Sequence, residues 1–231
     1  MFTGCSLAYK VLLGVDTTPD WKTEKQLRKQ AKKYRIPETY SLVLDTAIFY
    51  ERLKATYTAQ SNYIHVSEED SSEYFKLDHA LKDDVQPVQF RLFDQQGKEI
   101  FKLVNCYVDP PIPMNWNVNG CFDSFPPQIN IESLNSHYID LNLLLSCSSK
   151  LNKTKLTLTQ LPDSAYYGVI IWNDYFQRPS RKLIKTIQQY AEHSAQSIHL
   201  IFINNQNAYL WQVMDAATKA TVKEKLKKIQ S

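Results

Sequence analysis

Two nearly continuous apolar runs flank an amphipathic segment in the last third of the chain. The runs cover residues 167–173 (YGVIIWN) and 198–204 (IHLIFIN), a pattern typical of parallel strands that are buried on both faces. The pattern predicts a strand, helix, strand unit over residues 166–205, with a right-handed crossover by default. Between the runs, apolar residues recur with the period of a helix at Leu183, Ile184, Ile187, Tyr190 and Ala191.

A helix is predicted near the start of the chain, directly after residue 23. Thr23 and Gln26 occupy the two positions of a capping box, and an apolar stripe follows at Leu27, Ala31 and Tyr34. Further patterned segments predict a strand over residues 41–45 and helices over residues 47–57 and 70–82.

Apolar and polar residues alternate over residues 86–104. Phe90 and Leu92 alternate with polar neighbours and Gly97 supplies a turn, so we expect a β-hairpin. Pro87 precedes the first strand, at a position where folded chains tolerate a cis peptide bond.

Five prolines and three asparagines crowd residues 107–128, which predicts a long loop. We expect the aromatic residues of this loop to pack onto their own domain. Beyond it, the pattern favours a helix over residues 131–145, although residues 137–145 also fit a strand. An edge strand over residues 152–161 and a closing helix over residues 214–229 complete the expected elements.

Composition limits the chemistry that the chain can perform. Hydrophobic residues make up 43% and charged residues 22% of the chain, as in globular proteins. The net charge of +3 is too small to predict a nucleic-acid partner. The five glycines lack the spacing of a phosphate-binding loop, and the five histidines lack the spacing of a metal site. We therefore expect no cofactor and no metal. The sequence has no run of 18 apolar residues, so we also expect no membrane-spanning helix.

Cys5 follows an apolar residue and two small ones, as the lipidated cysteine does in bacterial lipoprotein signals. This interpretation requires that the charged and apolar regions of such a signal lie upstream of Met1. The predicted helix after Thr23 has a basic outer face, which is either ordinary solvated surface or a surface attracted to anionic lipid headgroups. The basic residues are Lys25, Arg28, Lys29, Lys32 and Lys33.

Cys106 and Cys121 bracket the proline-rich loop. In an oxidising compartment they could form a disulfide that closes about sixteen residues and stabilises the fold by about 3 kcal/mol. The alternative is two reduced, buried thiols. Cys5 and Cys147 allow other pairings, which the sequence does not distinguish.

The strand, helix, strand unit and the hairpin together resemble the thioredoxin-like fold. Residues 171–175 (IWNDY) match the aromatic strand end of that family, and Pro87 matches the proline that leads its hairpin. In the family the hairpin follows the unit, whereas here it precedes the unit by about eighty residues. The resemblance covers about half of the chain. It implies an α/β, thioredoxin-like three-layer sandwich with a rearranged, circularly permuted-like element order and a helical N-terminal extension.

The domain organisation that follows is simple. We expect residues 1–20 to form a tether and residues 21–231 to form one thioredoxin-like domain that carries the proline-rich loop. The family's paired cysteines belong at the start of the helix, where residues 176–180 read FQRPS. A thiol there would be activated by the helix dipole, and none is present. The chain is also similar to small thioredoxin-like lipoproteins of the bacterial envelope.

The resemblance implies a non-catalytic envelope lipoprotein, anchored to the membrane through Cys5, that binds a protein partner. Two alternatives stay open: a thiol-disulfide oxidoreductase that uses Cys106 and Cys121, and a cytoplasmic scaffold whose Cys5 is not lipidated. The residues expected to bind the partner are Pro87, Asp174, Tyr175, Phe176, Gln177 and Arg178.

Overall fold

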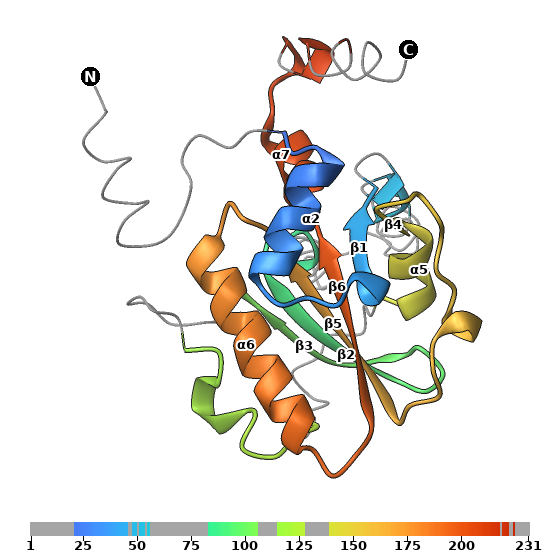
Figure 1. The fold of residues 1–231 in the computed structure, drawn as a ribbon, viewed down its shortest axis with the longest axis vertical. Coiled ribbons are helices and arrows are strands. Elements are labelled where there is room, and N and C mark those ends of the chain that lie inside the picture. Colours follow the sequence, from blue (N-terminus) through green and yellow to red (C-terminus); the bar gives the residue numbers. More distant parts are fainter. Residues whose placement is uncertain are drawn as a thin grey trace, which may run out of the picture.

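The computed structural model describes residues 21–45, 48–49, 51–53, 55, 83–105, 115–127, 139–217, 219–221 and 224. Within them, a mixed six-stranded sheet packs against helices, which places the chain in the α/β class (Figure 1). The strand order is β3-β2-β5-β6-β1-β4. The strands are β1 (Ser41–Leu44), β2 (Gln89–Asp94), β3 (Glu99–Val104), β4 (Ser148–Lys150), β5 (Tyr166–Trp172) and β6 (Ile198–Asn204). The main helices are α2 (Glu24–Lys33), α5 (Leu141–Ser146), α6 (Gln177–His193) and α7 (Gln206–Val213).

The predicted strand, helix, strand unit is confirmed as β5, α6 and β6. The two strands pair in parallel, and every residue of β5 after Tyr166 is buried. Helix α6 turns Leu183, Ile184 and Ile187 into the core, as its apolar period predicts. Strand β1 also runs parallel to β6, so the carboxyl ends of β5, β6 and β1 meet at one edge of the sheet.

The predicted hairpin is also confirmed. Strands β2 and β3 pair antiparallel, and Gly97 takes the left-handed conformation in the turn, with φ of 82°. Strand β2 then pairs antiparallel with β5, which brings the start of the hairpin to the carboxyl edge. The bond before Pro87 is trans; the cis proline bond among the described residues is Phe125–Pro126.

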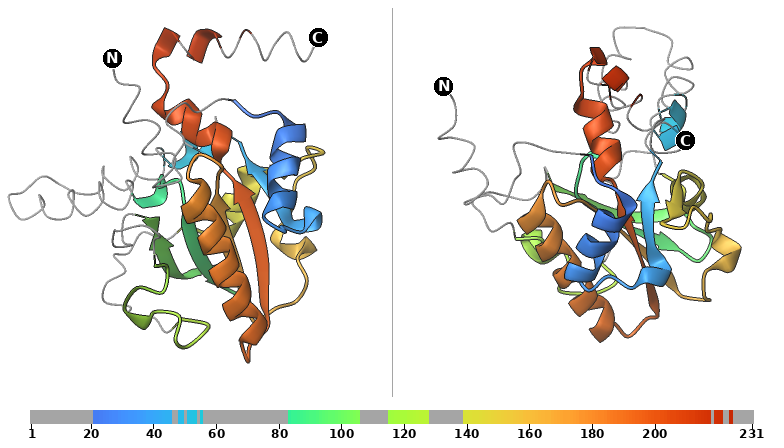
Figure 2. Two further views of the ribbon diagram at one scale, coloured as in Figure 1. Left: turned by 60° about the vertical axis from the view of Figure 1, so that its left-hand side comes forward. Right: turned by 45° about the horizontal axis from the view of Figure 1, so that its top comes forward.

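Helices cover both faces of the sheet (Figures 1 and 2). Helices α2 and α6 share one apolar core with the described part of the proline-rich loop, residues 115–127. Helix α5 packs into a second core on the opposite face. In the loop, Trp116 and Phe122 are almost fully buried, and Trp116 Nε1 donates to the Pro179 carbonyl at 3.1 Å. The prediction that this loop packs onto its own domain is therefore confirmed.

Helix α2 begins as its sequence predicts and ends in an unusual way. Thr23 and Gln26 form the capping box. At the other end, the Ile36 amide donates to the Ala31 carbonyl at 3.0 Å, across Arg35 in the left-handed conformation with φ of 58°. Glycine is the usual residue at such a helix end, because a side chain is strained there.

Two predicted elements are wrong in extent. Helix α5 begins only at Leu141, because Asp140 is extended and caps the helix by accepting from the Asn142 amide at 2.6 Å. The edge strand expected over residues 152–161 is absent; instead β4 pairs with β1, and Leu158–Gln160 form a 3-10 helix. Side chains such as Asn152 bond to nearby backbone there and compete with strand pairing.

The chain after β6 also differs from the prediction. Helix α7 occupies residues expected to lie between elements, and residue 214 ends it. Within the closing helix expected over residues 214–229, residues 216–217, 219–221 and 224 are helical. In the helix expected over 47–57, residues 48–49, 51–53 and 55 are helical. The tether, residues 1–20, and the helix expected over residues 70–82 lie outside the described residues.

Candidate binding site

Asn173, which directly follows β5, organises the carboxyl edge. Its side chain is fully buried, and its Nδ2 donates to the Pro87 carbonyl at 3.1 Å and to Asn205 Oδ1 at 2.9 Å. Its Oδ1 accepts from the Phe176 amide at 2.8 Å. One amide side chain therefore ties the loop after β5 to the hairpin and to the end of β6.

Gln206, the first residue of α7, holds the same loop from the other side. Its Oε1 accepts from the amides of Asp174 at 3.0 Å and Tyr175 at 3.1 Å. Asn204 Oδ1 accepts from the Gln206 amide at 3.0 Å, and Asn204 Nδ2 is buried with no hydrogen-bond partner among the described residues. We call Asn173, Asn204, Asn205 and Gln206 the edge network; all four side chains are buried.

Asp174 links the loop to α2. Its carboxylate accepts from the Tyr34 hydroxyl at 2.8 Å, from Gln30 Nε2 at 2.9 Å and from Gln177 Nε2 at 3.0 Å. Burial raises the pKa of Tyr34 well above its ordinary value, and the Asp174 charge raises this pKa further. The hydroxyl therefore stays protonated and donates to Asp174, which fixes the loop against the helix.

Three aromatic rings gather where this loop enters α6. The ring centroids of Tyr175 and Phe176 are 4.9 Å apart, and the Tyr209 ring of α7 lies 5.5 Å and 6.0 Å from them. All three side chains are partly exposed. Burial is the main cause that raises the pKa of Tyr209, and the nearby Tyr175 raises this pKa further. The Tyr209 hydroxyl therefore stays neutral at ordinary pH. We call these three residues the aromatic cluster.

The start of α6 offers little nucleophilic chemistry. The Ser180 hydroxyl is buried and accepts from the Asn173 amide at 3.2 Å. Arg178 is exposed, and Pro179 is buried. A loop whose backbone is hydrogen-bonded and whose aromatic side chains are partly exposed is suited to apolar contact with another molecule.

The structure brings the expected binding residues together, but Pro87 has a different role from the one expected. Asp174, Tyr175, Phe176, Gln177 and Arg178 are consecutive on the loop and first turn of α6. Pro87 is joined to the same loop because its carbonyl accepts a hydrogen bond from Asn173 Nδ2, but Pro87 itself is buried. Pro87 therefore supports the loop and is not part of its exposed surface.

Sequence reasoning missed the residues that hold this loop in place. The signal for some of them was the run NNQN at residues 204–207, where a buried strand ends. Because neighbouring parallel strands end at the same edge of a sheet, these polar residues could have been expected near the loop after residue 172. No comparable pattern marks the other supporting residues. The residues missed are Gln30, Tyr34, Asn173, Asn204, Asn205, Gln206 and Tyr209.

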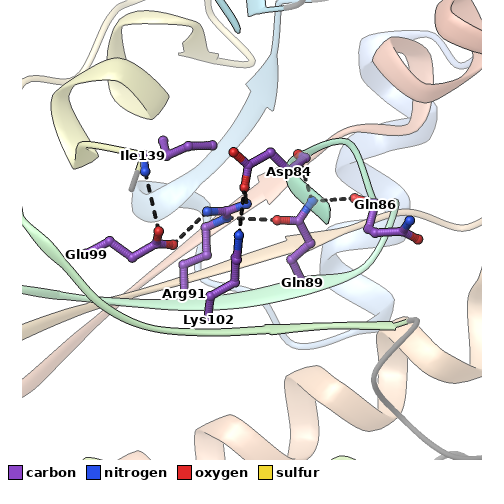
Figure 3. A network of polar contacts seen from close by, with 7 residues as sticks. All are labelled: Asp84, Gln86, Gln89, Arg91, Glu99, Lys102 and Ile139. Atoms are coloured by element: carbon purple, nitrogen blue, oxygen red, sulfur yellow. Dashed lines mark hydrogen bonds and ion pairs between the residues drawn. The ribbon is translucent and has the colours of Figure 1, made fainter. Parts of the chain in front are cut away.

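A second buried polar group lies on the face of the sheet away from α6 (Figure 3). Arg91 of β2 donates to Glu99 Oε1 at 2.6 Å and to Asp84 Oδ1 at 2.7 Å, and Lys102 Nζ lies 3.1 Å from Asp84 Oδ1. We call these four residues the ionic cluster. Arg91 Nε also donates to Gln89 Oε1 at 2.8 Å. These side chains are almost fully buried, so the cluster has no surface to present to a ligand.

The thiols offer little support for redox chemistry. Cys121 is a free, partly buried thiol whose Sγ lies 3.6 Å from the Trp116 carbonyl, and burial raises its pKa. A raised pKa disfavours the thiolate that attacks disulfides. Cys121 forms no disulfide in this structure, and Cys106 lies outside the described residues, so the disulfide expected between them in an oxidising compartment stays a prediction. Cys147 is buried between α5 and β4, and burial raises its pKa as well.

The described part of the chain contains no group of three or more His, Cys, Asp or Glu side chains placed to hold a metal ion. None of its helices combines the length and hydropathy that a membrane-spanning segment needs. The comparisons with known proteins return no match to a family model, a curated protein or a solved structure.

Proposed function

We propose that this protein is a thioredoxin-like module without redox activity, anchored to a bacterial envelope membrane through Cys5, that binds a protein partner. The binding surface is the aromatic cluster, Tyr175, Phe176 and Tyr209, on the loop held by the edge network. The observation that carries the proposal is that a loop whose backbone is held by buried amide side chains presents three partly exposed aromatic rings. The resemblance implies that the family's thiols would lie at this position.

The strand arrangement supports the thioredoxin-like part of the proposal. The antiparallel hairpin β2–β3 flanks β5, and β5 pairs in parallel with β6 after one helical crossover. This neighbourhood is the one expected when the family's hairpin is moved ahead of its strand, helix, strand unit. Pro87 then lies next to the loop after β5, with its carbonyl oxygen 3.1 Å from Asn173 Nδ2.

The network around the loop supports binding by side chains rather than by strand addition. Strand β2 is paired on both sides, and the carbonyls of Gln86 and Pro87 are both bonded, to Gln89 and Asn173. An incoming peptide therefore finds no free strand edge beside Pro87. Aromatic side chains on a fixed backbone lose little entropy on binding, which favours them as anchors.

Photo-crosslinking in intact cells tests the binding surface. Phe176 is replaced by p-benzoylphenylalanine, and the control carries the same group at His193, which is exposed at the far end of α6. We expect one protein adduct from position 176 that is missing from position 193. The purified partner must then bind the purified wild-type protein. Equal adducts from both positions, or no adduct from position 176, would refute the proposal.

The membrane anchor is tested separately. Cys5 lies outside the described residues, and its lipidation is a proposal from the sequence alone. Radiolabelled palmitate should be incorporated into the wild-type protein and not into Cys5→Ser. A high-salt wash should release Cys5→Ser from the membrane fraction and should leave the wild-type protein there. An unlabelled wild-type protein in the cytoplasmic fraction would instead support the scaffold alternative.

A further inference from the structure

A groove of about 480 Å³ lies between the C-terminal end of α2 and the middle of α6. Its charged lining is mainly basic: Lys33 and Arg35 come from α2 and its end, and Arg181 and Lys185 come from α6. Glu192 is the carboxylate in the lining. Within the described part of the chain, none of the four basic side chains forms an ion pair. The groove therefore holds uncompensated positive charge.

Rows of exposed basic residues lead into this groove. Lys25, Lys29 and Lys33 repeat at every fourth position along α2, so they lie on one side of the helix. Arg181 and Lys185 form the matching pair on α6. Helices α2 and α6 together carry nine basic and two acidic residues, a net charge of +7, whereas the rest of the chain carries 18 basic and 22 acidic residues, a net charge of −4. Helices α2 and α6, which share one apolar core, therefore carry the net positive charge of this sequence.

Arg35 is retained in this groove at a conformational cost. It occupies the left-handed position at the end of α2, with φ of 58°, where glycine would be unstrained. Its side chain is exposed and lines the groove, so it contributes nothing to the core. The exposed basic side chain of Arg35 therefore lies at the groove although its backbone is strained at this position.

We propose that this basic groove binds the phosphate groups of anionic phospholipids at a bilayer surface. The choice of a lipid surface over other polyanions rests on the proposed anchor, because Cys5 precedes Trp21, just ahead of α2, by only sixteen positions. Basic side chains near an anionic bilayer each strengthen binding about fivefold. Nucleic acid fits the groove less well, because its aromatic residue, Tyr34, is only 5% exposed and leaves no ring free for base stacking.

Vesicle co-sedimentation tests the proposal without the acyl chain. The full chain carries Cys5→Ser, and the probes are vesicles of phosphatidylcholine alone and of phosphatidylcholine with about one-third phosphatidylglycerol. We expect binding to the anionic vesicles and not to the neutral ones, and weaker binding as salt is added. Equal binding to both vesicles, or no binding to the anionic ones, would overturn the proposal.

Arg35→Gly is the sharpest variant, because it removes one charge and also relieves backbone strain. The matched control is Lys153→Gly, since Lys153 is exposed, basic and left-handed, with φ of 65°, but lies in the turn after β4. Both variants should raise the melting temperature by about 2–4 °C. Only Arg35→Gly should weaken binding to anionic vesicles, by about fivefold. Equal vesicle affinities for the two variants would contradict the assignment.

A double variant enlarges the effect and separates the polyanions. Arg181→Gln with Lys185→Gln should weaken vesicle binding by about 25-fold, and Lys98→Gln with Lys153→Gln, which removes the same charge elsewhere, should not. A single-stranded oligonucleotide that binds while the anionic vesicles do not would overturn the lipid assignment. Because the vesicle experiment uses neither Phe176 nor an acylated Cys5, its failure leaves the crosslinking result of the proposed function intact, and the reverse also holds.

Discussion

The ionic cluster and the edge network are both buried and polar, yet they hold different kinds of structure. In the ionic cluster, Arg91 and its partners form ion pairs with one another. These pairs join β2, β3 and the segment before β2. In the edge network, neutral amides such as Asn173 and Gln206 bond to the backbone of a loop whose side chains are partly exposed. The first closes a core, whereas the second fixes a surface. Buried charge therefore marks architecture in this protein, and buried amides mark the candidate site.

The energetic difference follows from desolvation. Burial raises the pKa of Glu99, although the Arg91 charge opposes this shift. Burial alone would lower the pKa of Arg91, but Glu99 and Asp84 raise it, so the guanidinium stays charged. Each charge in the cluster is tolerated only while its partners are present. A neutral amide costs less to bury than a charge, provided that it is hydrogen-bonded, so the edge network depends less on any single partner.

The largest effect is expected from breaking the ionic cluster. Arg91→Ala leaves the buried carboxylates of Asp84 and Glu99 without the guanidinium that bonds to both, so the free energy of unfolding should fall by about 3–5 kcal/mol. The control is Arg28→Ala, which removes an ion pair with Glu38 between side chains that are 52% and 68% exposed. That change should cost less than about 1 kcal/mol. Similar losses in urea unfolding would mean that the cluster is not a structural core.

Breaking the edge network should lower the free energy of unfolding by less than breaking the ionic cluster, and should loosen the loop after β5. Asn173→Ala leaves the Pro87 carbonyl, the Phe176 amide and Asn205 Oδ1 without their present partner, which should lower the free energy of unfolding by about 2–3 kcal/mol. The control is Asn152→Ala in an exposed turn, with an expected change of less than about 0.5 kcal/mol.

Hydrogen exchange locates the effect of Asn173→Ala. The amides of the loop from residue 174 to 176 should exchange faster, while those of β2 and β3 should keep their protection. Faster exchange across the hairpin strands instead would show that Asn173 supports the whole sheet rather than the loop.

The smallest expected effect concerns the link between α2 and the loop. Tyr34→Phe removes the bond to Asp174 and should lower the free energy of unfolding by about 1 kcal/mol at neutral pH. The pKa of Tyr34 is raised in the folded state above its ordinary value of 10.0, so the stabilisation is present below about pH 10 and is lost as the pH rises further.

Urea unfolding at pH about 8 and about 11 measures this link. The difference between wild type and Tyr34→Phe should shrink at the higher pH, because the unfolded tyrosine releases its proton there and the folded one does not. A difference that grows with pH would show that the hydroxyl is not buried against Asp174.

The sequence predicted the elements whose pattern is local. The apolar runs of β5 and β6, the period of α6 and the capping box at Thr23 all depend on neighbouring residues, and all are confirmed. The start of α5 was misjudged because the extended Asp140 interrupts an apolar pattern that continues across it. Helix α7 was missed because its apolar and polar residues do not alternate with the period of a helix. Its helical structure depends instead on contacts with the rest of the fold.

The candidate site was predicted only in part for the same reason. The loop from Asp174 to Arg178 follows a recognisable strand, so it could be placed from the sequence. The contacts that hold it join residues far apart in the chain, such as Tyr34 with Asp174 and Asn173 with Pro87, and no local pattern predicts them. The same holds for the basic groove, whose two helices are far apart in sequence.

The most direct measurement compares two equivalent phenylalanine truncations in binding to the purified partner identified by crosslinking. Phe176→Ala removes a ring from the aromatic cluster, and Phe125→Ala removes a partly exposed ring from the proline-rich loop, where it packs against Phe90 and Tyr190. We predict that Phe176→Ala weakens binding at least about tenfold while Phe125→Ala leaves it unchanged, because a central aromatic anchor contributes about 2 kcal/mol or more. Equal affinities for the two variants would contradict the assignment of the aromatic cluster as the binding surface.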